Sequence, residues 1–413
     1  MSPNFRIAIR FLLAKKRSMV MSLFGIVFGV AFFVVTQAQT SGFQELFIKT
    51  ILGANGAIII EDRFQNTLRS MPVEGTTFSV GDLSQRRIVL GVEDPDGVRR
   101  AVLDQFSNVT AISAIVRGSV FVTGPMRSFT GQVYGIDLDD HLRVSNLEGQ
   151  IVAGDLSAFR SGVSAIIMGR EFARILEVGV GDSITVEASG NGRRYRIVAL
   201  FETGAKDVDK SRIFMNLSDA RSLLRRPFGA SILQLMVRDR DRARSDAKRL
   251  EQVVDHVSVA WQDREKVWLG VFLALRISSA ITVSSIILIS GLGMFNTLAM
   301  IVMEKTREIS ILRSMGYTRR DISRIFIWQG VLVLVGGTVF GSIVGALLTL
   351  GVSKVPLPIQ GIFKTDTFVV NWSIWHYVTA AATAGVIVLI ASLIPARRAA
   401  RLEPGDVIRG TAS

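Results

Sequence analysis

The sequence predicts an α+β membrane protein in which four transmembrane helices carry one large mixed α/β domain, inserted between helices 1 and 2. The first observation is a set of four stretches, each of 27 to 30 residues, that contain no charged side chain. A bilayer core about 30 Å thick is crossed by roughly 20 apolar helical residues, so each stretch is long enough to span it. The second observation is the 222 residues of Glu45–Lys266, which have the composition of an ordinary globular domain. The four stretches are Ser18–Gln44, Ile277–Met303, Ile325–Ser353 and Thr367–Ala396.

The third observation is where the basic residues lie. The chain has a formal net charge of +13, yet Glu45–Lys266 has 30 Lys and Arg against 29 Asp and Glu. Three segments beside the spans are basic instead: residues 1–17 carry +5, residues 304–324 carry +3 and residues 397–413 carry +2. If four helices cross in sequence, these segments share one side, which the positive-inside rule makes the cytoplasm. The basic bias therefore indicates inner-leaflet topology with cytoplasmic termini, rather than nucleic-acid binding.

Residues 1–17 are expected to form a cytoplasmic amphipathic helix that leads into the first span, residues 18–44. Apolar side chains recur on one helical face and arginines on another, as in helices that lie on the inner leaflet. A cleaved signal peptide is the alternative, because a basic region precedes an apolar run. The run Met19–Val35 is longer than a usual signal core and no A-x-A site follows it, which favours the span. The apolar face comprises Phe5, Ala8, Ile9 and Leu12, and the other face Arg6 and Arg10.

Residues 45–266 are predicted to fold as a mixed α/β domain outside the membrane, without disulfides, because the chain has no cysteine. Asn216 and Asp239 are expected to cap helices, and Ser189–Gly192 to form a tight hairpin turn. Residues 63–87 have no clear period and are interpreted as an inserted loop or a mobile lobe. The expected strands are Ala57–Ile60, Ser119–Thr123, Gln132–Tyr134, Ala165–Met168, Ser183–Glu187, Arg196–Phe201 and Leu233–Val237. The expected helices are Pro95–Gln105, Arg170–Leu176, Leu217–Leu224 and Arg240–Val254.

A search for catalytic motifs finds none. The chain has no Gly-Lys pair, so it cannot bind ATP through a phosphate-binding loop of its own, and its three histidines belong to no H-E-x-x-H motif. His141 follows Asp137, Asp139 and Asp140, a cluster that suits either a cation or a solvated turn. The ligand spacing and glycine of a calcium site are missing, which favours the turn. We therefore expect a non-catalytic chain with no metal site. A second polar loop is expected at Asp207, Asp209 and Lys210.

The second half of the chain is expected to alternate spans and short connections. In order these are a stalk and second span at 267–303, a cytoplasmic loop at 304–324, a third span at 325–353, a short external loop at 354–374, a fourth span at 375–396 and a tail at 397–413. Within the cytoplasmic loop a helix is expected to end at Gly316, because glycine favours the left-handed cap conformation. Ile309 and Leu312, with Met315 as a third candidate, give this helix an apolar stripe beside charged residues. The loop is either a solvated turn or a docking surface, and the stripe favours docking.

The motifs of this loop and of the chain ends resemble those of the MacB and lipoprotein-releasing LolC/LolE permeases of ABC transporters. The loop reads Glu304-Lys305-x-x-Glu308-Ile309, followed by Gly316. Further matches are Ser41-Gly42-Phe43-Gln44, Ile51-Leu52-Gly53, Pro395-Ala396-x-x-Ala399-Ala400 and Glu403-Pro404. The resemblance implies a bacterial inner-membrane location, a periplasmic MacB-like core domain at 45–266, and a loop that docks on an ATPase subunit. The implied coupling residues are Glu304, Lys305, Glu308, Ile309, Leu312, Arg313 and Gly316.

The same resemblance implies the partners. We expect two copies of an ABC ATPase, which bind ATP and Mg²⁺, and a second permease chain that is identical or homologous. Membrane lipid is a further partner, and a periplasmic carrier or adaptor is an open expectation. In LolC a proline-rich hook recruits the carrier, and the matching hairpin here is Ile184–Leu200. Its tip has no proline, so the chain resembles a hook-less partner subunit or a homodimeric exporter of another hydrophobic cargo.

The spans themselves offer one candidate cargo surface. Phe28, Phe32 and Phe33 either line a lipid-accepting cleft or face bulk lipid. The motifs Gly25-x-x-x-Gly29 and Gly337-x-x-x-Gly341-x-x-x-Gly345 allow close helix contact, and packing within the subunit is favoured for the latter. The spans carry almost no ionisable groups, so no ion pathway is expected.

Three classes of function remain at this stage. The leading one is the permease subunit of an ABC exporter or lipoprotein extractor that takes cargo from the outer leaflet of the inner membrane. The second is an FtsX-like regulator that transmits an ATPase's conformational change to a periplasmic partner. The third is a membrane-anchored binding module, which three further spans and a docking-like loop make less suitable.

Overall fold

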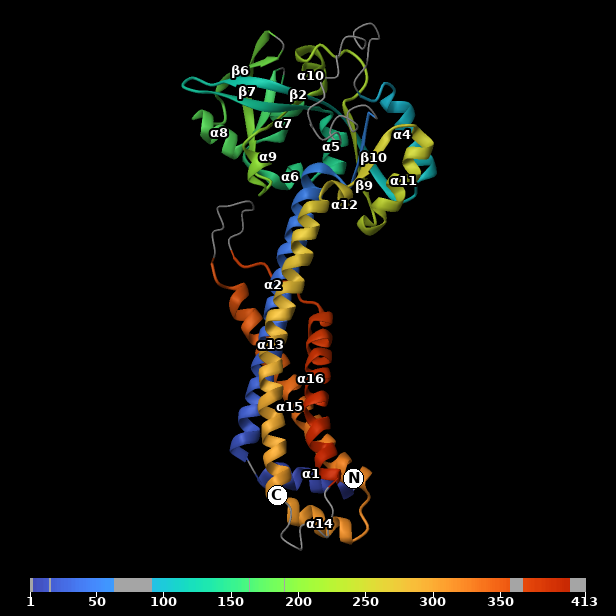
Figure 1. Cartoon of the computed structure of the whole chain (residues 1–413). Coiled ribbons are helices and arrows are strands. Elements are labelled where there is room, and N and C mark those ends of the chain that lie inside the picture. The colour runs from blue at the N-terminus through green and yellow to red at the C-terminus, as the bar shows by residue number, and fades with distance from the viewer. Residues whose placement is uncertain are drawn as a thin grey trace, which may run out of the picture. The chain divides into compact units, whose positions relative to one another are not determined.

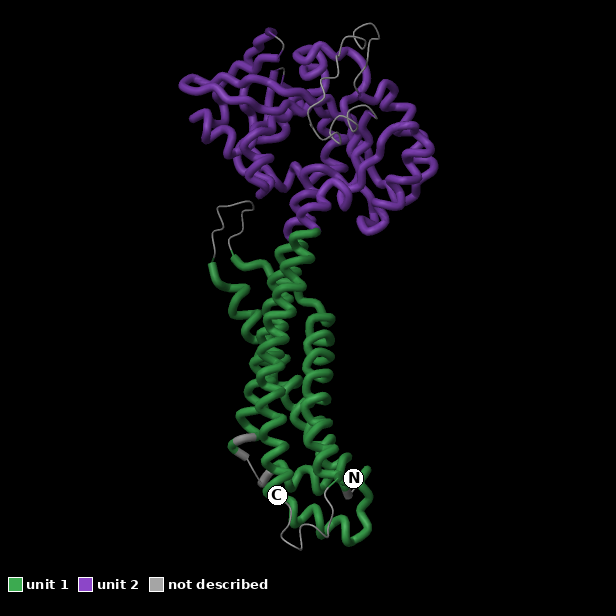
Figure 2. The backbone as a smooth tube through the Cα atoms, viewed as in Figure 1, with its two compact units in different colours: residues 1–45, 270–357, 367–413 green, residues 46–269, 358–366 purple. Residues whose placement is uncertain are grey.

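The computed structural model describes residues 3–14, 16–62, 91–162, 164–188, 190–356 and 367–401. The chain divides into two compact units: residues 1–45, 270–357 and 367–413 form unit 1, and residues 46–269 with 358–366 form unit 2 (Figure 2). The predicted fold class is confirmed, since unit 1 is helical and unit 2 is a mixed α/β domain. The stretch 63–87, most of the loop 354–366 and the motif Glu403-Pro404 lie outside the described residues.

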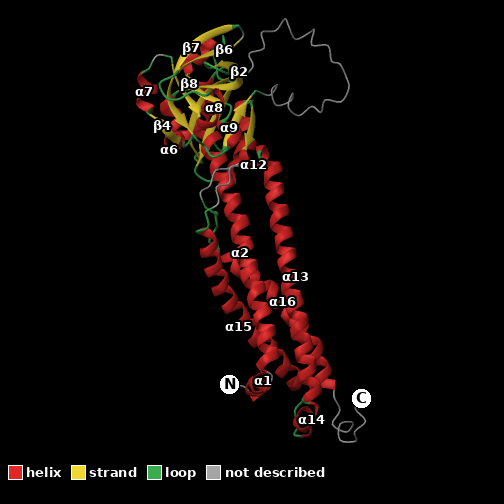
Figure 3. Ribbon diagram, turned by 90° about the vertical axis from the view of Figure 1, so that its left-hand side faces the viewer, coloured by secondary structure: helices red, strands yellow, loops and turns green. Residues whose placement is uncertain are grey.

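Among the described residues, four helices are long and apolar enough to cross a membrane, and most of their length lies in unit 1 (Figures 1 and 3). The first three are longer than their uncharged stretches: the first runs on to Asn55, the second begins at Lys266 and the third begins at Arg319. The fourth begins at Ile374, inside its stretch, and passes through Pro395 to Arg401. Two short helices, α1 and α14, lie together at one end of this bundle in both views. The helices are α1 (Pro3–Ala14), α2 (Lys16–Asn55), α13 (Lys266–Glu304), α14 (Thr306–Ser314), α15 (Arg319–Ser353) and α16 (Ile374–Arg401).

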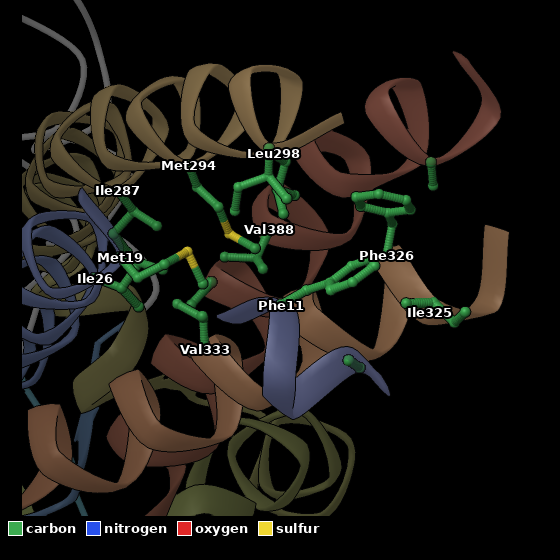
Figure 4. Packing of buried hydrophobic residues seen from close by; sticks show 14 of the residues in the cluster. Phe11, Met19, Ile26, Ile287, Met294, Leu298, Ile325, Phe326, Val333 and Val388 are labelled. Atoms are coloured by element: carbon green, nitrogen blue, oxygen red, sulfur yellow. The ribbon is translucent and has the colours of Figure 1, made fainter. Parts of the chain in front are cut away.

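Both glycine motifs pack within the chain, on two different faces of α2. A Cβ on Gly341 of α15 would meet Val30 Cβ at 2.8 Å and Val27 O at 3.0 Å, both on α2. A Cβ on Gly25 of α2 would meet Ser290 Oγ of α13 at 2.5 Å. Small residues thus let α2 approach both neighbours closely. In a bilayer no apolar surface is removed from water when helices meet, so close van der Waals packing stabilises the contact instead. Figure 4 shows the larger side chains of this core, with Met294 of α13 pointing toward Val388 of α16.

The sequence predicted that helix α1 lies on the inner leaflet with its apolar face toward lipid. In the structure this face packs against the helical bundle. Ala8 is completely buried, and Phe11 is 6% exposed beside Phe326 of α15, with ring centroids 6.5 Å apart (Figure 4). Phe5 makes an edge-to-face contact with Trp328 at 5.4 Å. Burying aromatic area against protein is worth more than leaving it at a hydrated interface, because the rings also pair specifically.

Unit 2 is built on ten described strands hydrogen-bonded in one mixed sheet, in the order β10-β1-β9-β2-β3-β8-β5-β7-β4, with β6 joining β2 and β7. Pairing is antiparallel except between β3 and β8 and between β5 and β7. The strands are β1 (Ile58–Glu61), β2 (Val109–Thr123), β3 (Ser128–Ile136), β4 (Ile151–Gly154), β5 (Ala165–Gly169), β6 (Ser183–Ala188), β7 (Asn191–Phe201), β8 (Arg212–Asn216), β9 (Ile232–Val237) and β10 (Val257–Ala260).

The sheet is buried on both faces. On β8, Ile213 and Met215 belong to one apolar cluster and Phe214 to another. On β5, Ile166 belongs to the first of these clusters and Ile167 to the second. Because successive strand residues point to opposite faces, the two clusters are the two sides of the sheet. The helices of unit 2 are α4 (Pro95–Gln105), α5 (Leu138–Val144), α6 (Leu147–Gln150), α7 (Leu156–Ser161), α8 (Arg170–Leu176), α9 (Lys206–Asp209), α10 (Leu217–Leu223), the 3-10 helix η2 (Arg240–Arg242), α11 (Ala243–Val254) and α12 (Trp261–Arg264).

Some predicted elements in this unit agree with the structure, and others differ from it in length or were missed. The helix Pro95–Gln105 is confirmed with its predicted bounds, and Asp239 caps η2 through the amide of Asp241. Asn216 is not a cap in the predicted sense: its amide nitrogen donates toward the carbonyls of Phe159 and Gly162 instead. The strands β4, β8 and β10 were not predicted, and of β2 and β3 only the segments Ser119–Thr123 and Gln132–Tyr134 were.

Candidate functional site

The candidate site is the segment that joins α13 to α15, at the end of the bundle where α1 also lies (Figure 1). Helix α13 ends at Glu304, and α14 follows after Lys305. The turn occurs at Gly316, as predicted: its φ of +98° is left-handed, and its amide donates to Arg313 O at 3.1 Å. Helix α15 then begins with a capping box in which Thr318 and Asp321 satisfy each other's backbone amides.

Helix α14 turns a different face outward from the one the sequence predicted. Ile309 is completely buried in the core of the bundle, and Leu312 packs against that core. Ile311 is 52% exposed and Met315 is 72% exposed. Ile309 and Leu312 of the predicted stripe therefore lie on the internal face, and Met315 does not. A nine-residue amphipathic helix gains most by burying its more apolar side against its own chain.

Charged side chains fasten α14 to its neighbours. Arg313 Nη1 donates to Ala400 O on α16 at 3.3 Å. Lys305 forms an ion pair with Glu308 one turn later, and its ammonium lies 5.9 Å from the centre of the Phe11 ring of α1. These contacts make Lys305 and Arg313 bracing residues that connect α14 to α1 and α16. Glu304 is exposed at the end of α13.

The outward face of α14, defined here by Arg307, Glu308, Ile311 and Met315, is the surface left for a partner. All four residues are exposed, and their spacing of one, three and four positions places them on one side of the helix. The face offers two apolar side chains between a cation and an anion, which suits protein docking rather than catalysis. In the sequence this face is marked by the four-residue spacing of Arg307, Ile311 and Met315. The apolar pair Ile309 and Leu312 favoured the other face in the prediction.

The aromatic side chains of α2 do not form one face. Phe28 and Phe32 are 50% and 46% exposed and stack with their ring centroids 6.5 Å apart. Phe33 is only 5% exposed and belongs to the bundle core, so it is removed from the candidate cargo surface. Phe24, which was not predicted, is 57% exposed. Positions 24, 28 and 32 repeat every four residues and therefore form one outward stripe.

The carboxylates of the acidic cluster of unit 2 make structural contacts, so the cluster is more than a solvated turn. Asp137 caps α5 through the amides of Asp139 and Asp140. Asp140 accepts two hydrogen bonds from Arg99, at 2.6 and 2.7 Å, which lower the pKa of its carboxyl. Asp139 pairs with Arg160. Among the described residues no group of three or more His, Cys, Asp or Glu side chains is placed to hold a metal ion.

Two buried side chains in unit 2 have shifted pKa values. His141 is completely buried beside Phe214, and this burial lowers its pKa to about 3. Asp209, predicted to lie in a polar loop, is 5% exposed instead, and burial raises its pKa. It accepts hydrogen bonds from the amide and hydroxyl of Thr203 at 2.8 and 2.7 Å, so it fixes the start of α9.

The hairpin at 184–200 is formed by β6 and β7, which pair from Ser183 with Arg196 to Ala188 with Asn191. The predicted turn is therefore shorter than Ser189–Gly192, since Asn191 and Gly192 are already in β7; Ser189 lies outside the described residues. Gly190 has a φ of +80°. Asn191 Oδ1 accepts from Arg225 at 3.3 Å, so the tip of the hairpin rests on the loop that follows α10.

Comparison with known proteins gives two family matches and several relatives of full length. The model of the MacB-like periplasmic core domain matches residues 19–253, and that of the FtsX-like permease C-terminal region matches residues 280–404. The chain is 25% identical to the lipoprotein-releasing system transmembrane protein LolC of Xylella fastidiosa (strain 9a5c), over 98% of each chain. It is 26% identical to LolE of Haemophilus influenzae, over 74% of this chain and 79% of that one. It is 23% identical to the uncharacterized ABC transporter permease YknZ of Bacillus subtilis (strain 168), over 98% of each chain.

Proposed function

Because this chain belongs to the family of ABC transporter permeases with a MacB-like periplasmic core domain and an FtsX-like C-terminal region, we propose that it couples ATP hydrolysis in a separate subunit to the extraction of a lipoprotein or another hydrophobic cargo. The chain is a permease of the bacterial inner membrane. In the proposed complex two ATPase subunits bind ATP and Mg²⁺, and a second permease chain, identical or homologous, completes the pathway. The cargo leaves the outer leaflet of the inner membrane.

The observation that carries the proposal is that α14 has one buried apolar face and a second apolar face that is exposed. Its inner face is held by Ile309, and its outer face leaves Ile311 and Met315 exposed. A helix this short gains little from exposing two large apolar side chains, unless a partner covers them. In our proposal the ATPase covers the outer face, and its movements reach the bundle through Arg313, which is bonded to α16, and Lys305, which lies beside α1.

The proposed cargo surface is the stripe Phe24, Phe28 and Phe32. Flat aromatic rings in a regular row suit acyl chains, which bind by area and shape and need no hydrogen bonds. Relatives named as lipoprotein-releasing proteins support a lipidated cargo. The three basic segments support cytoplasmic termini and a periplasmic domain, which places α14 on the side where ATP is available.

The test is reconstitution. The permease is co-purified with the ATPase encoded beside its gene, placed in proteoliposomes with a fluorescent lipoprotein, and assayed for ATP turnover and for cargo release. We expect no turnover by the permease alone, turnover by the complex, and release that requires ATP. Turnover without release, together with activation of a periplasmic hydrolase, would instead support the FtsX-like regulator. ATP hydrolysis by the isolated permease would contradict the proposal.

A further inference from the structure

The C-terminal end of α2 is held by polar contacts from three separate parts of unit 2. The last four carbonyls of a helix have no partner within the helix and normally face water or a cap. Here Gly53 O accepts the amide of Asn146 at 3.0 Å, and the next carbonyls are taken by side chains from elsewhere in the sequence. Gly56, in the left-handed conformation with a φ of +66°, ends the helix, and its amide donates to Leu52 O at 3.0 Å.

Arg212, on β8, is the first of two arginines that bind this helix end. Its Nη1 donates to Ala54 O at 3.0 Å and its Nη2 to Asn55 Oδ1 at 2.8 Å. The guanidinium stacks over the Tyr134 ring at 4.2 Å, and the residue is only 6% exposed. A buried cation is costly unless it is fully engaged, so this arrangement is held firmly.

Arg264, the last residue of α12, is the second arginine. Its Nη2 donates to Gly56 O at 3.2 Å, and its Nε lies 3.2 Å from Glu265 Oε1. The amide of Trp261 donates to Ala57 O at 2.9 Å. Arg264 stands two residues before Lys266, where α13 begins. The same contacts therefore bind the end of one spanning helix to the start of the next.

The two arginines suit this place on electrostatic grounds. The aligned peptide dipoles of a helix leave a partial negative charge at its C-terminus, which attracts cations. Hydrogen bonds to charged donors are about twice as strong as neutral ones. Two guanidinium groups, on the carbonyls of Ala54 and Gly56, thus hold the joint more stiffly than water or a glycine cap alone.

We propose that Arg212 and Arg264 are positioning residues that lock the end of α2 into the external domain as a rigid joint, so that a movement of α2 carries the sheet with it. The importance of this joint for transport rests on the proposed function, whereas its rigidity does not. Gly56 by itself is a natural hinge, because it lacks a side chain and has a positive φ. The arginines remove that freedom by fixing the carbonyls on either side of it to β8 and to α12.

The rigidity is tested by hydrogen exchange in the full-length chain, held in lipid nanodiscs without any partner. In Arg212→Met and in Arg264→Met, the amides of Gly56 and Ala57 are expected to exchange roughly tenfold faster, because their hydrogen bonds open with the loosened helix end. Arg221→Met is the matched control. Arg221 Nη2 also donates to a backbone carbonyl, Gly229 O at 3.2 Å, but that loop does not touch α2, so exchange at 56–57 should not change.

Asn55→Ala guards against loss of folding, because it removes only the Nη2 acceptor and leaves Arg212 paired with Ala54. We expect a smaller increase in exchange at the same amides, with an unchanged melting temperature for the rest of unit 2. Unchanged exchange in all three joint variants would overturn the proposal. An increase spread evenly over the whole domain would also overturn it, since that result indicates general destabilisation.

Transmission is tested separately in the complex with the ATPase. Arg212→Met should retain ATP turnover per complex while the amount of cargo released per ATP falls several-fold, and Arg221→Met should change neither. Equal coupling in both variants would contradict a role in transmission. If the wild-type permease binds no ATPase, the proposed function fails, but the exchange measurement on the isolated chain still decides whether the joint is rigid.

Discussion

Ile309 and Ile311 lie two residues apart on the same nine-residue helix, and one is completely buried while the other is 52% exposed. Ile309 belongs to the core of the bundle, and Ile311 shares the outward face of α14 with Met315. The two isoleucines therefore have different roles. Ile309 keeps α14 in place, and Ile311 is available to a partner.

The first prediction is that Ile311→Asp combined with Met315→Asp abolishes docking of the ATPase. Each large apolar side chain contributes on the order of 1–3 kcal/mol when a partner buries it, and a carboxylate in the same contact is costly to desolvate. Co-purification with the ATPase should fall at least tenfold, while the melting temperature of the permease stays the same. Normal co-purification would show that the outer face of α14 is not the docking surface.

The second prediction concerns the inner face. Ile309→Ala removes buried atoms from the bundle core and should destabilise it by about 2–4 kcal/mol, measured as a lower melting temperature in detergent. Ile311→Ala is the matched control, because the same atoms are lost from an exposed position. Equal losses of stability in both variants would contradict the orientation of α14.

The third prediction is topological, and the absence of cysteine makes it simple to test. Glu187 and Met315 are both exposed, so Glu187→Cys and Met315→Cys place one thiol each in unit 2 and beside Gly316. A maleimide that cannot cross the inner membrane, added to cells with a permeabilised outer membrane, should label the first variant only. Labelling of Met315→Cys before the inner membrane is opened would reverse the proposed orientation.

The fourth prediction is an acid-sensitive external domain. The pKa of His141 is about 3 in the fold and 6.5 ordinarily, so the unfolded chain takes up its proton first as the pH falls. The stabilising effect of the neutral, buried ring is complete above about pH 6.5, and it is lost between there and pH 3 at up to about 1.4 kcal/mol per pH unit. Stability against urea at pH 4 to 7 should therefore depend less on pH in His141→Phe. An unchanged pH dependence in His141→Phe would contradict a stabilising role for the neutral, buried ring.

The fifth prediction tests the packing of α15 on α2. Gly341→Leu places a side chain against Val30 and the backbone of Val27, so the helices must separate at a cost of about 1–3 kcal/mol or more. Gly351→Leu, on the same helix, meets nothing within 4 Å and should be tolerated. A comparison of thermal unfolding in nanodiscs decides the matter, and equal stability of the two variants would contradict close packing at Gly341.

Much of the candidate site was visible in the sequence, but its orientation was not. The turn at Gly316 was predicted, because one residue type satisfies its backbone conformation. The choice between the Ile309 and Ile311 faces depends on the neighbouring end of α13 and on Phe11 and Ala400, which come from two distant segments of the chain. A helical pattern shows that one face is apolar, yet it cannot show which apolar residue the rest of the chain covers.

The sequence by itself determined the four spans, the inserted domain and the segments that flank the membrane. Apolar length and the placement of charge act locally, so they are readable without any contact map. Only the tertiary structure decided that Phe33 is internal while Phe28 is exposed, and that Arg212 meets Ala54. The side chain of Arg212 is bonded to a carbonyl 158 positions earlier in the chain, and no periodic signal records such a pairing. The reason is physical: burial and hydrogen bonding of a single side chain depend on which distant surfaces folding brings to it.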